Sequence, residues 1–297
     1  MRQFAQKVAI GVWLIISRGG VEMIFDMRTR CMAEKFLDTC STAMGVSNIP
    51  ALLDHHDDDV FSLSASLERQ IRRLSNEIDW QNVSIIGTHV LGSLDDCSEV
   101  KQNGLKGLAE VLAGDTILSR LLRERGIVVD VKNKMLRCGA SKYDINYERF
   151  RRRYVLDGLD EALLHIARRV YADSGLTAFL YTSDPKNYGT DIHLRPEFIG
   201  DLARVCLEAS KLDLWWKSNS TPYEIDFFAT IDQINTITFG LEPSCEYSLG
   251  EYEKESIAKW MFETSLLRSQ NRLAESCLFL KPEACIPSSQ FISCRAF

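Results

Sequence analysis

The sequence predicts an α/β (α+β) fold with a mixed central sheet and flanking helices. Short apolar runs rich in β-branched or aromatic residues, typical of strands, occur at 83–90, 176–181 and 223–231. Stretches with apolar residues at helical spacing, such as 63–78, lie between and beside these runs. Strands interspersed with helices along one chain indicate a sheet that helices cover.

Composition supports a folded protein. The chain has 297 residues, enough to bury a large core, and its hydrophobic fraction of 45% and charged fraction of 26% are ordinary for globular proteins. A mean hydropathy of −0.11 argues against membrane and disordered classes, so we expect a soluble, cytoplasmic protein without stable membrane association. The net charge of −6 offers no global attraction to phosphate. A protein or nucleic-acid target is possible, and the oligomeric state is not predicted.

The N-terminus allows three interpretations. Arg2 and Lys7 precede the apolar run 8–16, as in a targeting segment, but no small-residue cleavage site follows. The run could also be a genuine first strand or helix. Alternatively, translation begins at Met23, because the codons for 18–22 can be purine-rich in the manner of a ribosome-binding site. We therefore divide the chain into four expected parts: a mis-called start or leader (1–22), a helical segment (23–82), an α/β core (83–275) and a loose tail (276–297).

The first half of the chain is expected to contain helices around one strand. Apolar spacing predicts a helix within 23–45, before Pro50 interrupts, and a second helix over 63–78. A buried strand follows at 83–90, and Asn103-Gly104 should end a helix over 96–102. Further expected elements are helices at 105–112 and 117–125, the latter capped by Asp115-Thr116, and a hairpin module of 127–131, 135–137 and 143–145.

The second half alternates again. A long helix is expected over 157–171, a strand over 176–181, and a loop over 183–188. Pro196 suits the first turn of a helix over 197–211. The remaining expected elements are a short strand at 192–194, a strand at 223–231 and an amphipathic helix at 257–267.

Cysteines and histidines do not predict a metal site. The nine cysteines include no C-x-x-C pair, so we expect reduced thiols and no structural zinc. The run His55-His-Asp-Asp-Asp59 is rich in ligand types, but adjacent side chains on a polar loop point in different directions. Two basic runs, 69–73 and 149–153, are either solvated helix faces or phosphate contacts.

His89 is the candidate chemical residue. It lies at the end of an apolar strand, beside a loop and a following helix, where ligand clefts commonly form. Its imidazole could hold a ribose hydroxyl or carry a proton. The alternative is a half-buried histidine that bonds to the backbone.

The order strand, Thr88-His89, short loop, helix and Gly104-Leu105 resembles the opening of ADP-ribosyltransferase-like proteins, which include DNA- and RNA-modifying toxins. The resemblance covers residues 83–106, and Leu91 stands where that family has threonine. It implies NAD as the cofactor, a histidine and a tyrosine that hold it, and a glutamate that stabilises the sugar cation formed when nicotinamide leaves. The residues assigned on this basis are Thr88, His89 and Tyr188 for NAD binding, and His89 and Glu224 for catalysis.

Two of these assignments have competitors. Tyr181 and Tyr188 both flank the loop after the 176–181 strand, and Glu197 competes with Glu224 for the carboxylate role. Glu224 lies on a strand-like run, whereas Glu197 begins a helix and could complement its dipole. A carboxylate beside an oxocarbenium-like transition state is the requirement that glycosidases also meet. Arg195, near a helix N-terminus, would suit a pyrophosphate, or could form an Arg–Glu surface pair.

The expected function is thus NAD-dependent glycosyl transfer, as in a toxin or phage-defence effector. Common phosphate-loop, dinucleotide, hydrolase and zinc-protease motifs are missing from the sequence. One alternative is a metal-dependent nuclease, for example with Asp130, Lys132 and Lys134. The other is a non-catalytic protein-interaction module.

Overall fold

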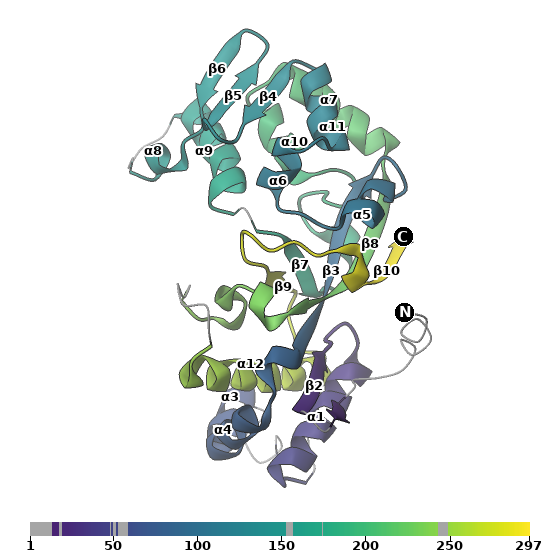
Figure 1. Cartoon of the computed structure of the whole chain (residues 1–297), viewed down its shortest axis with the longest axis vertical. Helices are drawn as coiled ribbons and strands as arrows, with labels where there is room; N and C mark the ends of the chain where they lie inside the picture. Colours follow the sequence, from purple (N-terminus) through teal and green to yellow (C-terminus); the bar gives the residue numbers. More distant parts are fainter. Residues whose placement is uncertain are drawn as a thin grey trace. The chain divides into compact units, whose positions relative to one another are not determined.

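The computed structural model describes residues 14–17, 20–47, 49, 52, 59–152, 157–173, 175–242 and 249–297. It confirms a mixed α/β fold with helices around a central sheet (Figure 1). The chain divides into two compact units, each assembled from three stretches of sequence. Unit 1 comprises residues 1–88, 178–183 and 226–279, and unit 2 comprises residues 89–177, 184–225 and 280–297.

The central sheet has seven strands among the described residues and mixes strand directions. β2 (Gly20–Phe25) runs parallel to β3 (Val83–Ser93), with Phe25 opposite Ile85. β3 runs antiparallel to β7 (Thr177–Tyr181). The order is β1-β2-β3-β7-β9, and β8 pairs with both β3 and β10; the remaining bounds are β1 Leu14–Ser17, β8 Thr221–Thr230, β9 Ser276–Phe279 and β10 Phe291–Ala296.

Helices of unit 1 form its second layer. α1 (Arg30–Met44) begins at Thr29, whose hydroxyl accepts the Met32 N–H, and ends at Gly45 in the left-handed conformation. α12 (Glu251–Ser269) packs against α1, α3 (Val60–Ser66) and α4 (Glu68–Glu77). Aromatic contacts link β2 to these helices: Phe25 packs edge-to-face on Phe36 and at a tilt on Trp260, which in turn meets Phe239 edge-to-face.

Unit 2 has its own core. The hairpin module is a three-stranded antiparallel sheet of β4 (Ile127–Asp130), β5 (Met135–Cys138) and β6 (Ser141–Asp144), as the sequence predicted. Its apolar face packs into one cluster with helices that follow and precede it. These helices are α6 Leu108–Ala113, α7 Ile117–Glu124, α8 Tyr147–Arg151, α9 Gly158–Tyr171, α10 Glu197–Ala203 and α11 Leu207–Asn219. A further helix of this unit, α5 (Ser98–Asn103), contributes no residue to the cluster.

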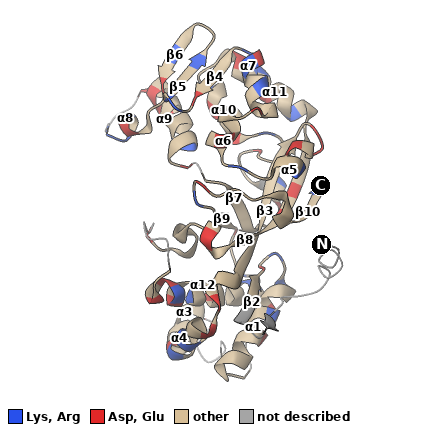
Figure 2. Ribbon diagram, viewed as in Figure 1, with Lys and Arg blue, Asp and Glu red and all other residues tan. Residues whose placement is uncertain are grey.

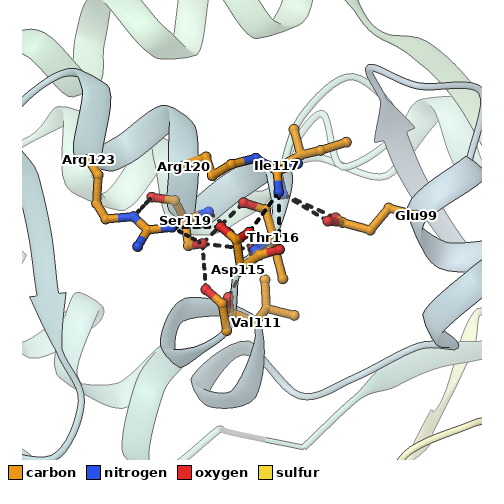
Figure 3. Close-up of polar contacts among 9 residues, drawn as sticks. Glu99, Val111, Asp115, Thr116, Ile117, Ser119, Arg120 and Arg123 are labelled. Carbon is orange, nitrogen blue, oxygen red and sulfur yellow. Dashed lines mark hydrogen bonds and ion pairs between the residues drawn. The ribbon is translucent and has the colours of Figure 1, made fainter.

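Side-chain caps fix the start of α7. Ser119 donates its N–H to the Thr116 hydroxyl, and Thr116 donates its N–H to the Ser119 hydroxyl. The Glu99 carboxylate accepts the Ile117 N–H at 2.9 and 3.3 Å (Figure 3). A carboxylate from α5 therefore satisfies an N–H that the helix itself leaves without a partner.

Several predicted elements need correction. The expected tail 276–297 is not loose, because it contributes β9 and β10 to the sheet. The helix expected within 23–45 covers only residues 30–44, and residues 20–25 form a strand. Pairing with β3 explains why the first residues of this stretch are extended instead of helical. Residues 192–194 form turns instead of a strand. The helices expected at 63–78 and 197–211 are each divided, at Leu67 and at 204–206.

Two sequence hypotheses concern residues that are only partly described. Residues 1–13, 18–19 and 55–58 lie outside the described part of the chain, so the alternative start and the His55–Asp59 run stay predictions. Asp59 is described, and its carboxylate caps α3 by accepting the N–H groups of Phe61 and Ser62. None of the helices in the described ranges has the length and apolar character that crossing a membrane requires.

Candidate functional site

His89 is held by the backbone of unit 2. Its Nδ1 atom lies 2.9 Å from the carbonyl oxygen of Thr177. A carbonyl can only accept, so Nδ1 carries the proton and Nε2 is the basic nitrogen. Burial lowers the pKa of His89, although the Thr177 bond partly opposes this, and the ring is therefore neutral at pH 7. This geometry matches the alternative of a half-buried histidine bonded to backbone.

Thr88 and Glu224 lie on one face of the sheet and His89 on the other. The Thr88 hydroxyl donates to Asp226 Oδ1 at 2.7 Å, which shows that these residues share a face. Side chains alternate along a strand, so Glu224, two residues from Asp226, also lies on that face. By the same alternation His89, next to Thr88, points the opposite way.

Glu224 has a partner of its own. Its Oε2 atom accepts from Arg295 NH2 at 2.8 Å, which joins β8 to β10. Glu197, its competitor, pairs with Arg169 at 2.9 Å at the start of α10. Both carboxylates are neutralised by arginines within unit 2.

Arg195 also has an internal counter-ion. Its Nε contacts Asp213 Oδ1, and its NH1 donates to the Thr190 carbonyl at 3.2 Å. The side chains of Arg195 and Asp213 are only 12% and 14% exposed. Arg195 therefore forms an ion pair, but with an aspartate and largely buried, instead of the Arg–Glu surface pair that was the alternative. Tyr188 follows the short 3₁₀ helix Pro185–Asn187, is partly buried, and accepts the Thr190 N–H at its carbonyl.

The remaining sequence candidates carry structural contacts. The Asp130 carboxylate accepts two N–H groups of Asn133 in the hairpin turn. Arginines of both basic runs pair with acidic neighbours, as Arg73 does with Glu77 and Arg149 with Asp144. Charges of both signs lie together on α4 and α12 (Figure 2). Among the residues that the structure describes, no group of three or more His, Cys, Asp or Glu side chains is arranged to hold a metal ion.

A different polar cluster lies in unit 1, at the carboxyl end of β2. We define the Arg28 cluster as Asp26, Arg28, Thr88 and Asp226. Arg28 forms two bonds with Asp26, from Nε to Oδ1 at 3.0 Å and from NH2 to Oδ2 at 2.7 Å. Its NH1 lies 2.7 Å from Asp226 Oδ2. One guanidinium thus joins the segment after β2 to the middle of β8.

Burial distinguishes this cluster from surface ion pairs. The Asp26 and Asp226 side chains are 6% and 2% exposed, whereas Arg28 is 27% exposed. Burial acts to lower the pKa of Arg28, but bonds and charge from Asp26 and then Asp226 outweigh it, so the pKa is raised. The two carboxylates are therefore buried, and the Arg28 guanidinium is the charged group of the cluster that is exposed to solvent.

Arg268, near the end of α12, adjoins the cluster. Its Nε and NH2 donate to the carbonyl oxygens of Met27 and Arg28 at 3.1 and 3.2 Å. Its guanidinium carbon lies 4.0 Å from the centre of the Tyr181 ring, at the end of β7. Within the described part of the chain, the contacts given for Arg268 are to neutral groups, two carbonyls and an aromatic ring.

Sequence reasoning missed this cluster. Asp26 directly follows an apolar strand that pairs in parallel with β3, and ligands of α/β sheets commonly bind beyond the carboxyl ends of such strands. That signal was available once 20–25 was recognised as a strand, but Asp226 and Arg268 are about two hundred residues away in sequence. Of the candidates named from sequence, only Thr88 and Tyr181 contact these residues. Comparison with protein families, with curated proteins and with solved structures finds no match to this chain.

Proposed function

We propose that this protein binds a phosphorylated ligand through Arg28 and Arg268 at the carboxyl end of β2. The observation that carries the proposal is Arg268, a partly buried guanidinium whose contacts among the described residues are all neutral. A cation removed from water without a counter-ion is unfavourable, so an anionic ligand would stabilise it.

A phosphate group suits this arrangement better than a monatomic anion such as chloride does. Guanidinium groups present N–H donors in a planar fork that matches phosphate oxygens, and here the Arg268 guanidinium bonds to the backbone carbonyl of Arg28. The Tyr181 ring packs against the guanidinium of Arg268, and two bonds to Asp26 orient the guanidinium of Arg28. Preorganised donors lose little conformational freedom when a ligand binds.

The chemical step is a separate question. Asp226 accepts from Thr88 and Arg28 on its two oxygens, so it is engaged as a structural acceptor in this arrangement. We therefore propose binding here, with nucleotides as the ligand class to test first. NAD belongs to that class, and ADP-ribosyl transfer stays a prediction from the resemblance of residues 83–106.

Thermal unfolding with inorganic phosphate, ATP, NAD and a short oligonucleotide tests the proposal, with equal ionic strength of chloride as the reference. A ligand that binds only the folded state raises the unfolding midpoint with concentration. Arg268→Gln should weaken binding by about tenfold or more, since a bond to a charged group contributes roughly 1.5–3 kcal/mol. Arg73→Gln, an exposed arginine on α4, should leave binding unchanged.

Two results would overturn the proposal: no phosphate compound shifts the midpoint beyond the chloride reference, or Arg268→Gln and Arg73→Gln bind equally well. Release of nicotinamide in the NAD sample would separately support the transferase prediction.

Cytoplasmic location is likewise our proposal; its support is that none of the eight described cysteines is in a disulfide.

A further inference from the structure

Two thiols from distant parts of the sequence meet in unit 2. Cys97 directly precedes α5, and Cys294 lies on β10 near the end of the chain. The two sulfhydryl groups contact each other, and both are free in this structure. Their separation in sequence means that only the fold brings them together.

The strand pairing agrees with this contact. β10 pairs with β8, and the Phe297 N–H donates to the Pro222 carbonyl at 3.3 Å while Arg295 reaches Glu224. Since Arg295 and Glu224 share a face, alternation places Cys294 on the opposite face, with Tyr223. The Tyr223 hydroxyl in turn donates to Asp96, the residue before Cys97.

The two thiols differ in their access to solvent. Cys97 is fully buried, whereas Cys294 is partly exposed. Burial, reinforced by the neighbouring Cys294, raises the pKa of Cys97 to about 12. An external reagent can reach only a thiol that is exposed to solvent. The partly exposed Cys294 is therefore the thiol that reacts with it first.

We propose that Cys97 and Cys294 are a thiol–disulfide exchange site whose co-substrate is a low-molecular-weight disulfide. The Cys294 thiolate attacks one sulfur of that disulfide, forms a mixed disulfide and expels one thiolate. Cys97 then loses its proton and attacks the Cys294 sulfur, which expels the second thiolate. Two protein thiols lose two electrons to the small disulfide, which is reduced to two thiols. The product links the start of α5 covalently to the C-terminal strand.

Oxidised glutathione with the full chain tests the proposal. After alkylation of the remaining thiols and digestion without reductant, mass spectrometry should find the peptides of Cys97 and Cys294 joined, two hydrogens lighter than the separate pair. Reduction with dithiothreitol should release them. Cys285→Ser, which changes an exposed thiol of the same C-terminal segment, should leave the linked peptide unchanged.

Single variants separate the two steps. In Cys97→Ser, glutathione should stay trapped on Cys294, because the thiol that resolves the mixed disulfide is missing. In Cys294→Ser, neither the linked peptide nor glutathione on Cys97 should form. The proposal is overturned if the folded wild-type protein retains glutathione on Cys294 without resolving it, or if Cys97 reacts equally well in the Cys294→Ser protein.

Discussion

The imidazole of His89 donates from Nδ1 to the carbonyl oxygen of Thr177 across 2.9 Å, from β3 to the first residue of β7. Burial lowers the pKa of the ring below its usual 6.5, so the folded protein keeps His89 neutral where an unfolded chain would protonate it. Burial of the ring, and not this bond, therefore gives His89 a predictable effect on how stability depends on pH.

His89 should make the protein less stable as the pH falls below about 6.5. Above that pH the ring is neutral in both the folded and the unfolded state. Below it the unfolded chain binds a proton that the folded chain does not, so the free energy of unfolding falls as the pH decreases from about 6.5 to the lowered pKa of the folded state. Urea unfolding at pH 7.5 and 5.5 checks this. His89→Asn should remove part of the pH dependence, and a His89→Asn protein with the full wild-type dependence would contradict the assignment.

Arg28→Met should cost about 3–5 kcal/mol in the free energy of unfolding, because it leaves Asp26 and Asp226 buried without their cation. Denaturant unfolding at constant pH measures the loss. Arg30→Met is the matched control, since Arg30 is two residues away, 56% exposed and paired with exposed Glu34. That control should change stability by less than about 1 kcal/mol. Equal losses in both variants would show that the Arg28 cluster is no more than a surface pair.

Glu99→Ala should destabilise α7 by about 1 kcal/mol, as the loss of other N-terminal caps does. The Ile117 N–H would lose its acceptor, and the helix N-terminus would lose a stabilising negative charge. Amide hydrogen exchange at 117–119 reports the local effect, and denaturant unfolding the total. Glu110→Ala, at an exposed residue that pairs with Lys106, should leave exchange in α7 unchanged. Equal exchange in both proteins would contradict the capping role.

Gly200→Ala should destabilise unit 2 by about 1–3 kcal/mol, because an added Cβ would lie 2.6 Å from Arg195 NH2. The guanidinium packs flat on the glycine while it pairs with Asp213. Gly158→Ala is the matched control: it also lies in a helix, and its added Cβ meets nothing within 4 Å. The control should be neutral or slightly stabilising. Thermal unfolding of both variants distinguishes the outcomes, and a neutral Gly200→Ala would mean that Arg195 moves freely.

The region around the candidate site shows which structural features local residue patterns can predict. The Gly104 stop and the β4–β5–β6 module were predicted, because each depends on local spacing and turn chemistry. The expected strand end at His89 was wrong, because β3 continues to Ser93 and His89 lies within it. The expected association of His89 with Glu224 depended instead on which strands pair and which faces their side chains take. The contacts of His89 with Thr177 and of Glu224 with Arg295 leave that association a prediction.

The sequence by itself determined the class of fold and the position of most helices and strands. It could do so because hydrophobic period, capping residues and glycines act over a few residues. Tertiary structure alone decided that residues 20–25 form a strand, that 276–297 complete the sheet, and that Arg268 and Asp226 meet Arg28. Strand pairing, hydrogen bonds and buried ion pairs join segments that are about two hundred residues or more apart, and no local pattern encodes the partner.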